Sequence, residues 1–320
     1  MWKIAGAGIA GSFLYNRLTN SGFDVEIYDP KVENFYIPCG FATNKNLIIP
    51  YLKMVGIDFD QVCEIEDGPM TISGNKFEPL EVKNLGLSTI HKMRLEKLMV
   101  GDNVIRKRCQ HHNGSGFIDA TGISRALLPK PAEDRTMYAM EKICPISQYK
   151  GFYFYFFPRG RGYFWSFPLK GTYHVGAGGI NLEEVKSYLN PYKETKLVSR
   201  KIRMKPIMEN IFTKNCIGVG ESIGYISPLL GEGIIPALES AEVLFQCIKS
   251  QDSLDEIGRA FRERTGKRMK EFQRLSNLVR KVQSGKIISF TNIFSLGLVM
   301  REMRNFGIGI STSKVLGHFL

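Results

Sequence analysis

The sequence is poor in the features that mark membrane, exported and metal-binding proteins. No apolar run reaches the roughly eighteen residues that a membrane-spanning helix needs. The N-terminus has neither the basic segment nor the cleavage site of a signal peptide. The six cysteines are scattered, with no CxxC pair and no Cys/His cluster at metal-ligand spacing. We therefore expect a cytoplasmic protein without a disulfide framework and without a metal site.

Acidic residues are scarce relative to basic ones. The chain has 31 Asp and Glu against 43 Lys and Arg, a net charge of +12, and residues 259–320 hold thirteen basic residues but three acidic ones. Such a segment is typical of a surface that meets an anionic membrane or an acidic protein, although a solvated helix without a partner has the same composition. No helix-turn-helix, zinc or RNA-binding motif accompanies the charge, so we expect no nucleic acid partner.

The first thirty residues contain a glycine motif inside a β-α-β pattern. A strand, a helix and a second strand are predicted over residues 2–28, with Gly6, Gly8 and Gly11 between the first strand and the helix. Such glycines allow a tight turn, the approach of a pyrophosphate to the backbone and close helix packing. Asp29, which ends the second strand, can hold a ribose hydroxyl. The sequence therefore predicts dinucleotide binding by Gly6, Gly8, Ala10, Gly11 and Asp29.

The middle of the chain has a different pattern. Residues 137–179 are rich in alternating aromatics broken by glycines, which predicts hairpins of an antiparallel sheet. Taken alone, the aromatic stripes over residues 152–157 and 163–168 are more typical of a sheet core than of a ligand pocket. From residue 240 onward the pattern is helical, with an amphipathic segment over residues 254–283.

Two further strand-to-glycine turns decide which dinucleotide is expected. They are FIDATG at residues 117–122 and IGVGES at residues 217–222, the latter followed by PLLGEGI at residues 228–234. In this order they resemble the two-dinucleotide-fold flavoproteins of the p-hydroxybenzoate hydroxylase type, which implies FAD as the cofactor. In that family an acid of the late motif contacts the ribityl or pyrophosphate group, and a glycine-rich helix start faces the flavin ring edge. The resemblance implies these further cofactor-binding residues: Ala120, Gly122, Gly220, Glu221 (in place of the usual Asp), Gly231, Gly233 and Ile234.

Within that superfamily, three separated motifs resemble the geranylgeranyl reductase family. They are PCG at residues 38–40, YFWSFPLK with HVGAG over residues 163–178, and SPLLGEGI at residues 227–234. The resemblance covers most of residues 1–245. That family includes the archaeal enzymes that saturate the isoprenoid chains of membrane lipids, and relatives that act on chlorophyll side chains.

The resemblance implies roles for individual residues of these motifs. Cys39 and Gly40 would lie beside the flavin, with Cys39 as a candidate catalytic acid, a positioning contact or a small packing residue. A substrate tunnel would be lined by Tyr163, Trp165, Phe167 and Pro228. The Asp-Arg pair usual in the family is replaced by His91-Lys92, so that Lys92 keeps a basic group near the cofactor. The C-terminal region is shorter than is usual in the family.

The expected function is an FAD-dependent oxidoreductase that reduces isolated C=C bonds of a polyprenyl lipid, by hydride from reduced flavin plus a proton. The alternatives are an FAD-dependent monooxygenase on the same fold and a flavin-binding redox partner without catalysis. No second GxGxxG motif is found, so the electron donor would be a ferredoxin-like protein or transiently bound NAD(P)H. The basic C-terminal segment would dock such an acidic donor, or hold the protein on the inner face of a membrane.

The expected fold class is α/β. A Rossmann-like FAD-binding domain is predicted from residues 1–44, 83–136 and 213–250. An antiparallel β-sheet substrate domain is predicted from residues 45–82 and 137–212, and a basic helical C-terminal tail from residues 251–320.

Overall fold

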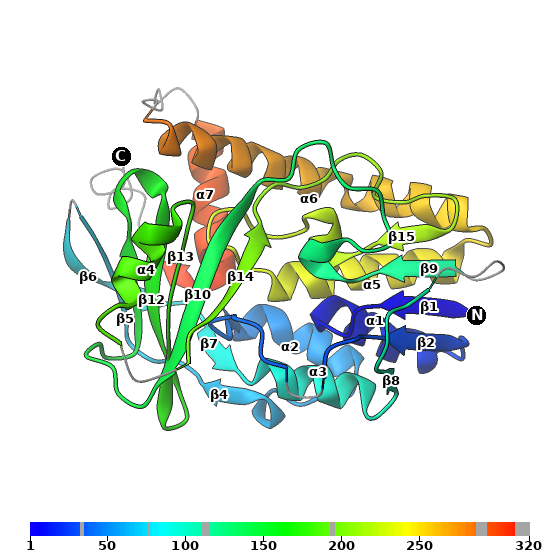
Figure 1. The fold of residues 1–320 in the computed structure, drawn as a ribbon, viewed down its shortest axis with the longest axis horizontal. Coiled ribbons are helices and arrows are strands. Elements are labelled where there is room, and N and C mark those ends of the chain that lie inside the picture. The colour runs from blue at the N-terminus through cyan, green and yellow to red at the C-terminus, as the bar shows by residue number, and fades with distance from the viewer. Residues whose placement is uncertain (33–34, 76, 111–115, 193–195, 286–292, 311–320) are drawn as a thin grey trace.

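The β-α-β segment and the aromatic segment of the sequence form separate sheets at opposite ends of the molecule (Figure 1). The computed structural model describes residues 1–32, 35–75, 77–110, 116–192, 196–285 and 293–310. Within these ranges no helix is both long and apolar enough to cross a membrane.

The N-terminal β-α-β pattern forms a parallel sheet. Its strands lie in the order β15 (Cys216–Gly218), β9 (Gly116–Asp119), β1 (Trp2–Ala5), β2 (Val25–Tyr28) and β8 (Val104–Ile105). Helix α1 (Ile9–Thr19) connects β1 to β2 and packs against α3 (Lys92–Val100) and α5 (Ile234–Ser250), and α5 packs in turn against α6 (Leu254–Gln283). Because the carboxyl ends of these strands meet at one edge, the turns that follow them gather there.

The aromatic middle of the chain forms most of a larger sheet. Its strands lie in the order β14 (Val198–Arg203), β10 (Thr136–Cys144), β13 (Thr172–Gly179), β12 (Gly162–Leu169), β11 (Phe152–Phe156), β5 (Met70–Gly74), β6 (Phe77–Asn84) and β16 (Ile308–Gly309). Neighbours are antiparallel except β11 and β5. Alternation along the strands gives the sheet two faces. One packs against α4 (Leu182–Leu189), and the other carries Tyr163, Trp165 and Phe167.

A small third sheet and several short helices connect the two large sheets. The third sheet has the order β3 (Ala42–Asn44), β7 (Leu87–Ile90) and β4 (Cys63–Ile65), and α2 (Lys45–Met54) follows β3. The short 3-10 helices are η1 (Phe59–Gln61), η2 (Gly122–Ser124), η3 (Pro158–Gly160) and η4 (Gly220–Ile223). Helices η2 and η4 follow the predicted turns after β9 and β15, so they lie at the carboxyl edge of the parallel sheet.

The C-terminal region is more than a helical tail. Helix α7 (Ile293–Phe306) packs Met300, Met303 and Phe306 against the aromatic face of the eight-stranded sheet, and β16 pairs with β6 at its edge.

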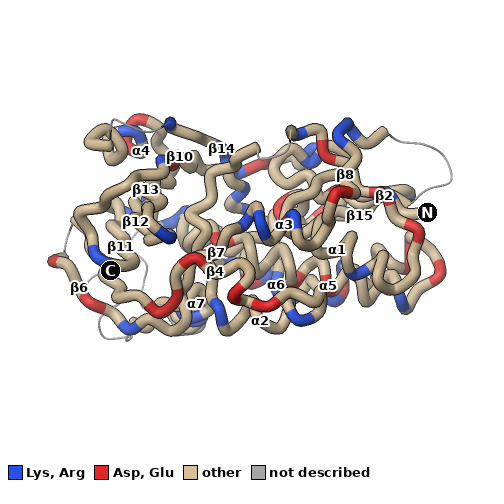
Figure 2. Tube along the Cα trace, turned by 90° about the horizontal axis from the view of Figure 1, so that it is seen from below, with Lys and Arg blue, Asp and Glu red and all other residues tan. Residues whose placement is uncertain are grey.

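Along the molecule both signs of charge are interspersed (Figure 2). Helix α6 nevertheless exposes these basic side chains: Arg259, Arg262, Arg264, Lys267, Lys270, Arg274, Arg280 and Lys281.

The expected α/β architecture is confirmed, with a parallel sheet, an antiparallel aromatic sheet and C-terminal helices. The division into domains stays a prediction. All five strands of the parallel sheet fall inside residues 1–44, 83–136 and 213–250, whereas β6 crosses the predicted boundary at residue 83.

Candidate functional site

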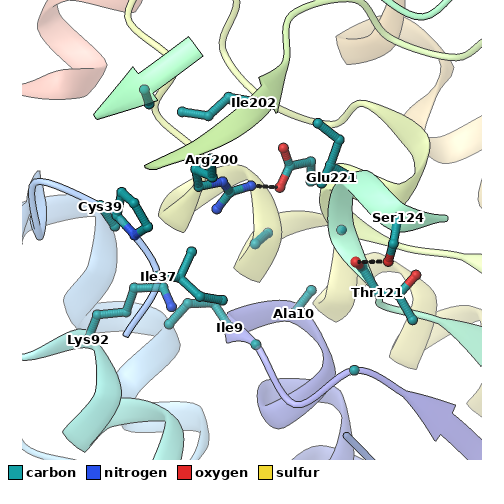
Figure 3. A pocket seen from close by; sticks show the side chains of 18 of the residues that line it. Ile9, Ala10, Ile37, Cys39, Lys92, Thr121, Ser124, Arg200, Ile202 and Glu221 are labelled. Carbon is teal, nitrogen blue, oxygen red and sulfur yellow. Dashed lines mark hydrogen bonds and ion pairs between the residues drawn. The ribbon is translucent and has the colours of Figure 1, made fainter. Parts of the chain in front are cut away.

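A cavity of about 1340 Å³ lies between the carboxyl edge of the parallel sheet and the aromatic face of the eight-stranded sheet (Figure 3). Pockets for small ligands usually measure roughly 300–1,000 Å³, so this one has room for more than a single small molecule. The structure brings these sequence-predicted residues to its wall: Gly6, Gly8, Ala10, Asp29, Cys39, Gly40, Lys92, Ala120, Gly122, Tyr163, Trp165, Phe167, Glu221, Gly231, Gly233 and Ile234.

The glycines of the first motif have distinct surroundings. Gly6 has a φ of +100°, and a Cβ there would lie 2.4 Å from the Ala120 carbonyl oxygen. A Cβ at Gly11 would lie 1.9 Å from the Gly6 carbonyl oxygen, so Gly11 serves the packing of α1 and does not line the cavity. At Gly8, which does line it, a Cβ would meet no protein atom closer than Glu96 Oε1, at 3.7 Å. The open space over Gly8 therefore belongs to the cavity.

Helix α1 begins at this open space. Its N-cap is Gly8, which offers no capping side chain, and no acidic residue lies in its first turn. The first backbone N–H groups of a helix lack partners within the helix, and the helix dipole favours an anion there. The residues present fit the pyrophosphate of a dinucleotide: an uncapped helix start, a glycine without a side chain and a cavity in front of both.

Asp29 holds the turn that faces this helix start. The residue is 2% exposed; Oδ2 accepts a hydrogen bond from the Ala7 N–H (2.9 Å), and Oδ1 accepts one from the Lys31 N–H (3.0 Å). Lys31 Nζ lies 3.0 Å from Oδ2. Each carboxylate oxygen has two lone pairs, so the carboxylate can still accept a ribose hydroxyl.

Glu221, the acid of the late motif, lines the cavity but already has protein partners. Its carboxylate forms an ion pair with Arg200 of β14 (Figure 3) and accepts a hydrogen bond from the Arg203 N–H (3.0 Å). Arg200 also lines the cavity. No sequence motif indicates this pair, because β14 reaches the turn only through the pairing of the eight-stranded sheet. The cavity wall therefore carries the Glu221 carboxylate and the Arg200 guanidinium side by side.

The basic group predicted at Lys92 is also paired. Lys92 Nζ lies 2.5 Å from Glu96 Oε1, one turn further along α3. His91 is the N-cap of that helix, and its Nδ1 accepts the Arg94 N–H at 3.1 Å. His91 therefore has a local structural role, and Lys92 is the member of the pair that reaches the cavity wall.

The aromatic wall depends on two glycines. A Cβ at Gly176 would lie 2.2 Å from Cζ2 and 2.4 Å from Cε2 of Trp165, so the indole occupies the place where a side chain at position 176 would be. A Cβ at Gly40 would lie 2.9 Å from Phe167 Cδ2 and 3.0 Å from Trp165 Nε1. The PCG and HVGAG motifs thus provide the space in which the rings of the wall lie.

The wall is joined to the glycine-rich loop before α5. The hydroxyl of Tyr163 donates a hydrogen bond of 2.5 Å to the Leu230 carbonyl, next to Gly231, which has a φ of +68°. In that loop Glu232 lines the cavity and accepts the Ile235 N–H at 2.9 Å. Burial raises the pKa of Glu232 to about 8, which favours its neutral form at pH 7. The loop over Leu230 and Gly231 is therefore held by the aromatic wall through Tyr163.

Three predicted residues lie off the cavity wall, and several unpredicted ones lie on it. Gly220 has a φ of +64° and a Cβ there would lie 3.1 Å from Ala10 Cβ, so it allows close packing of the turn on α1. Pro228 borders a separate small cavity beside Arg135, and Gly11 packs as described above. No motif of the sequence indicated these wall residues: Tyr36, Met137, Arg200, Ile202 and Phe306.

Cys39 lies on the wall with its thiol buried. Burial raises the pKa of this thiol, and the positive charge of Lys92 opposes that rise only in part. The residue is therefore a neutral thiol at pH 7. Its backbone carbonyl lies 3.2 Å from Nδ1 of His174, a buried side chain of β13. A catalytic role of Cys39 stays a prediction.

The chain is similar in sequence to known proteins. No family model matches the chain. An uncharacterized protein of Methanocaldococcus jannaschii is 26% identical over 87% of this chain and 90% of its own length. The digeranylgeranylglycerophospholipid reductase of Methanococcus vannielii is 32% identical over 115 residues, which is 30% of each chain.

Solved structures match over nearly the whole chain. A geranylgeranyl bacteriochlorophyll reductase-like protein from Thermoplasma acidophilum has a TM-score of 0.66 and 18% identity, covering 95% of this chain and 98% of that one. A probable FAD-dependent monooxygenase from Pseudomonas aeruginosa has a TM-score of 0.64 and 13% identity, covering 93% and 98%. The chain therefore has the fold of FAD-dependent flavoproteins, and its resemblance to a geranylgeranyl reductase-like protein is confirmed at the level of the fold.

Proposed function

We propose that this protein is an FAD-dependent oxidoreductase that reduces isolated C=C bonds of a polyprenyl lipid. The observation that carries the proposal is the continuity of the cavity. One end is the glycine-lined start of α1, and the other is the wall of Tyr163, Trp165 and Phe167. A cofactor held at the first end would extend its ring toward the second, where an apolar chain is the ligand that the lining favours.

The residues at the first end fit FAD. The N–H groups at the start of α1 and the backbone over Gly8 would hold the pyrophosphate. Asp29 would accept a ribose hydroxyl, and the loop at Gly231 and Gly233 would present N–H groups to the ring edge. When bound and reduced, FAD supplies a hydride, that is, a proton with an electron pair.

The residues at the second end fit an alkene without a polarising group. Reduction of such a bond needs a hydride at one carbon and a proton at the other, and positive charge develops between the two transfers. The aromatic faces of Tyr163 and Trp165 would stabilise that charge through their quadrupoles. Apolar side chains continue the lining beyond these rings and would take the remainder of the prenyl chain: Met137, Ile202, Leu230 and Phe306.

The electron donor is proposed from the charge of helix α6. Its exposed basic side chains would dock an acidic, ferredoxin-like protein or the surface of an anionic membrane, where a prenyl lipid is found. NAD(P)H acting by transient contact is the other donor that the chain would accept.

A monooxygenase is the second candidate function, and the similarity to a probable FAD-dependent monooxygenase supports it. The two candidates differ in what reoxidises the reduced cofactor. A monooxygenase would consume oxygen faster in the presence of its substrate, whereas a prenyl reductase passes electrons to the lipid without oxygen.

The visible spectrum of the purified protein tests the proposal. Flavin absorption that bleaches with dithionite and returns anaerobically after addition of a geranylgeranyl lipid would support a prenyl reductase. Flavin that returns only in air would refute the prenyl substrate and favour the second candidate or a non-catalytic flavoprotein. A protein that takes up no flavin, even after reconstitution with FAD, would contradict both candidates.

A further inference from the structure

Glu141 is a buried carboxyl that lies behind the aromatic wall. It belongs to β10, and its side chain has no exposure to solvent. Among the described residues no lysine or arginine forms an ion pair with it, and its Oε2 has no hydrogen-bond partner. An ionised carboxylate in such a place would be strongly unfavourable. The carboxyl must therefore be protonated, or serve a function that offsets the free-energy cost of its burial.

Two side chains connect this carboxyl to the cavity wall. The hydroxyl of Tyr36 donates a hydrogen bond to Glu141 Oε1, and Tyr36 itself lines the cavity. Nδ1 of His174 lies 3.2 Å from the Cys39 carbonyl oxygen and 3.4 Å from Glu141 Oε1. A carbonyl only accepts, so the hydrogen of the neutral ring lies on Nδ1. Nε2 is then an acceptor, 3.4 Å from the Tyr36 hydroxyl.

The register of three strands places Trp165 on the same carboxyl. Glu141 pairs with Gly176, and Gly176 pairs with Trp165, so the three residues form one row on one face of the sheet. The indole lies over Gly176 and thus toward Glu141. Trp165 Nε1 is near enough to lower the pKa of Glu141, although neither Nε1 nor Oε2 completes a hydrogen bond.

Burial, and not a neighbouring charge, favours the protonated form of the carboxyl. Burial raises the pKa of Glu141 to about 8, and the Tyr36 hydroxyl, the Cys39 N–H and the Trp165 indole reduce that rise only in part. Burial lowers the pKa of His174 to about 4, so the ring is neutral at pH 7. The titratable and charged groups that face this cluster from the neighbouring elements are Tyr36, Cys39, His91, Lys92, His174 and Arg200.

We propose that Tyr36 donates the proton of the reduction and that Glu141, held with it by His174, replaces that proton. The inference rests on the proposed function. With its proton on Oε1, the Glu141 carboxyl donates to the Tyr36 oxygen, and the Tyr36 hydrogen is free to turn to the cavity. In the step, the Tyr36 hydroxyl gives its proton to one alkene carbon and takes the proton of the Glu141 carboxyl. The hydride of the proposed reaction supplies the electron pair and the second hydrogen to the neighbouring carbon. The carboxylate left at Glu141 takes one proton from water before the next turnover.

Burial makes Glu141 a weak acid at rest, and positive charge on a substrate would make it a stronger one. Its pKa is high because no cation compensates its negative form. Positive charge that develops on a substrate against Trp165 provides that compensation, since the indole is shared by the substrate wall and the carboxyl. The carboxylate and the developing cation then stabilise each other in a site of low dielectric constant.

Cys39 is the other candidate donor on this wall, and its contacts are less suitable. Among the described residues no hydrogen bond joins its thiol to Glu141, whose Oε1 is bonded to Tyr36. The Tyr36 hydroxyl has that connection. Loss of a positioned general acid reduces a rate by about 100-fold to 10,000-fold. Replacement of Tyr36 and of Cys39 should therefore have very different effects.

The first test measures the proton on Glu141 without turnover. Infrared spectra of the full-length protein between about pH 6 and pH 9 should show a protonated carboxyl band that disappears as the pH rises through about 8. Burial raises the pKa of Glu232 to about 8 as well, so we expect a second band from its carboxyl. Glu141→Gln should remove the band of Glu141, and Glu232→Gln should remove the second band and leave that of Glu141. Tyr36→Phe should raise the pKa at which the Glu141 band disappears. A Glu141 carboxyl that is ionised at pH 7 would overturn the proposal whatever the substrate.

The second test measures reduction of a geranylgeranyl lipid in anaerobic single turnovers. We expect Tyr36→Phe to bind flavin normally and to lose about 100-fold in rate, and Cys39→Ala to lose less. Tyr188→Phe, in α4 on the other face of the sheet, is the matched control and should keep the wild-type rate. Glu141→Gln should also be slow, and Glu141→Asp should recover part of the rate with an altered pH profile. A wild-type protein that reduces no lipid would refute the proposed function while the infrared result stood. A wild-type rate with Tyr36→Phe, or a loss confined to Cys39→Ala, would refute the relay alone.

Discussion

A substitution at Gly8 is expected to weaken the binding of a cofactor with little effect on the stability of the fold. The Gly8 φ of −81° and ψ of −174° are open to any residue, and an added Cβ would meet no protein atom within 3.7 Å. We therefore expect Gly8→Ala to fold normally, with a cost of about 0.5–1 kcal/mol for the changed N-cap. Any larger effect of the methyl group must fall on a ligand in the cavity.

The size of that effect follows from hydrogen-bond geometry. A pyrophosphate oxygen must come within about 3 Å of the backbone N–H groups at the start of α1. A methyl group at Gly8 would keep it out of that range, and the loss of a hydrogen bond to a charged group costs about 1.5–3 kcal/mol. We expect FAD affinity to fall by roughly 10-fold to 150-fold.

The assay is a titration of FAD into flavin-depleted protein, followed by fluorescence, with the melting temperature measured on the same samples. Gly11→Ala is the matched control. Its Cβ would lie 1.9 Å from the Gly6 carbonyl oxygen, and backbone cannot yield easily, so we expect a loss near the upper end of about 1–3 kcal/mol in stability. If Gly8→Ala binds FAD as tightly as the wild type, the pyrophosphate does not pass this residue and the assignment of the site is wrong.

Three further predictions concern packing, pH and surface charge. Gly176→Ala should cost about 1–3 kcal/mol in denaturant unfolding, and clearly less in a Trp165→Leu background; equal losses in both would show that the indole does not fill this place. Glu141 holds a proton that the unfolded chain releases between about pH 4.5 and pH 8. Stability is therefore lost as the pH rises over that range, and the melting temperature of Glu141→Gln should fall less; parallel curves would contradict the raised pKa. Reversing the charges of Lys267 and Lys270 should weaken sedimentation with anionic vesicles, and binding that persists in roughly 0.5 M salt would argue against an electrostatic surface.

The sequence allowed prediction of the parts of the site that are local in the chain. The turn at Gly6 and Gly8 depends on a strand, a glycine motif and a helix within thirty residues, so its conformation is encoded where it is found. The turns that begin at Ala120 and Gly231 are similarly marked, because each is a strand or loop that ends in small residues. Their common position at one cavity follows from the parallel sheet, whose strand ends share an edge.

The parts that escaped prediction depend on the pairing of distant segments. Arg200 reaches Glu221 because β14 pairs with β10, and no pattern in residues 198–203 indicates that neighbour. Likewise, Phe306 lines the cavity because the chain after it pairs with β6 through Ile308 and Asn84. A sequence period shows which face of an element is apolar, but it does not show which element covers that face.

The row of Trp165, Gly176 and Glu141 explains why two motifs of the sequence occur together. Residue 176 must lack a side chain because the indole of the neighbouring strand occupies that place. The indole reaches the carboxyl of the next strand for the same reason, since Gly176 lies between them in register. Gly176 therefore allows Trp165 and Glu141 to approach each other, and Gly176 itself need not contact a ligand. One small residue in the middle strand thus brings the ring that would stabilise positive charge next to the acid that would supply the proton.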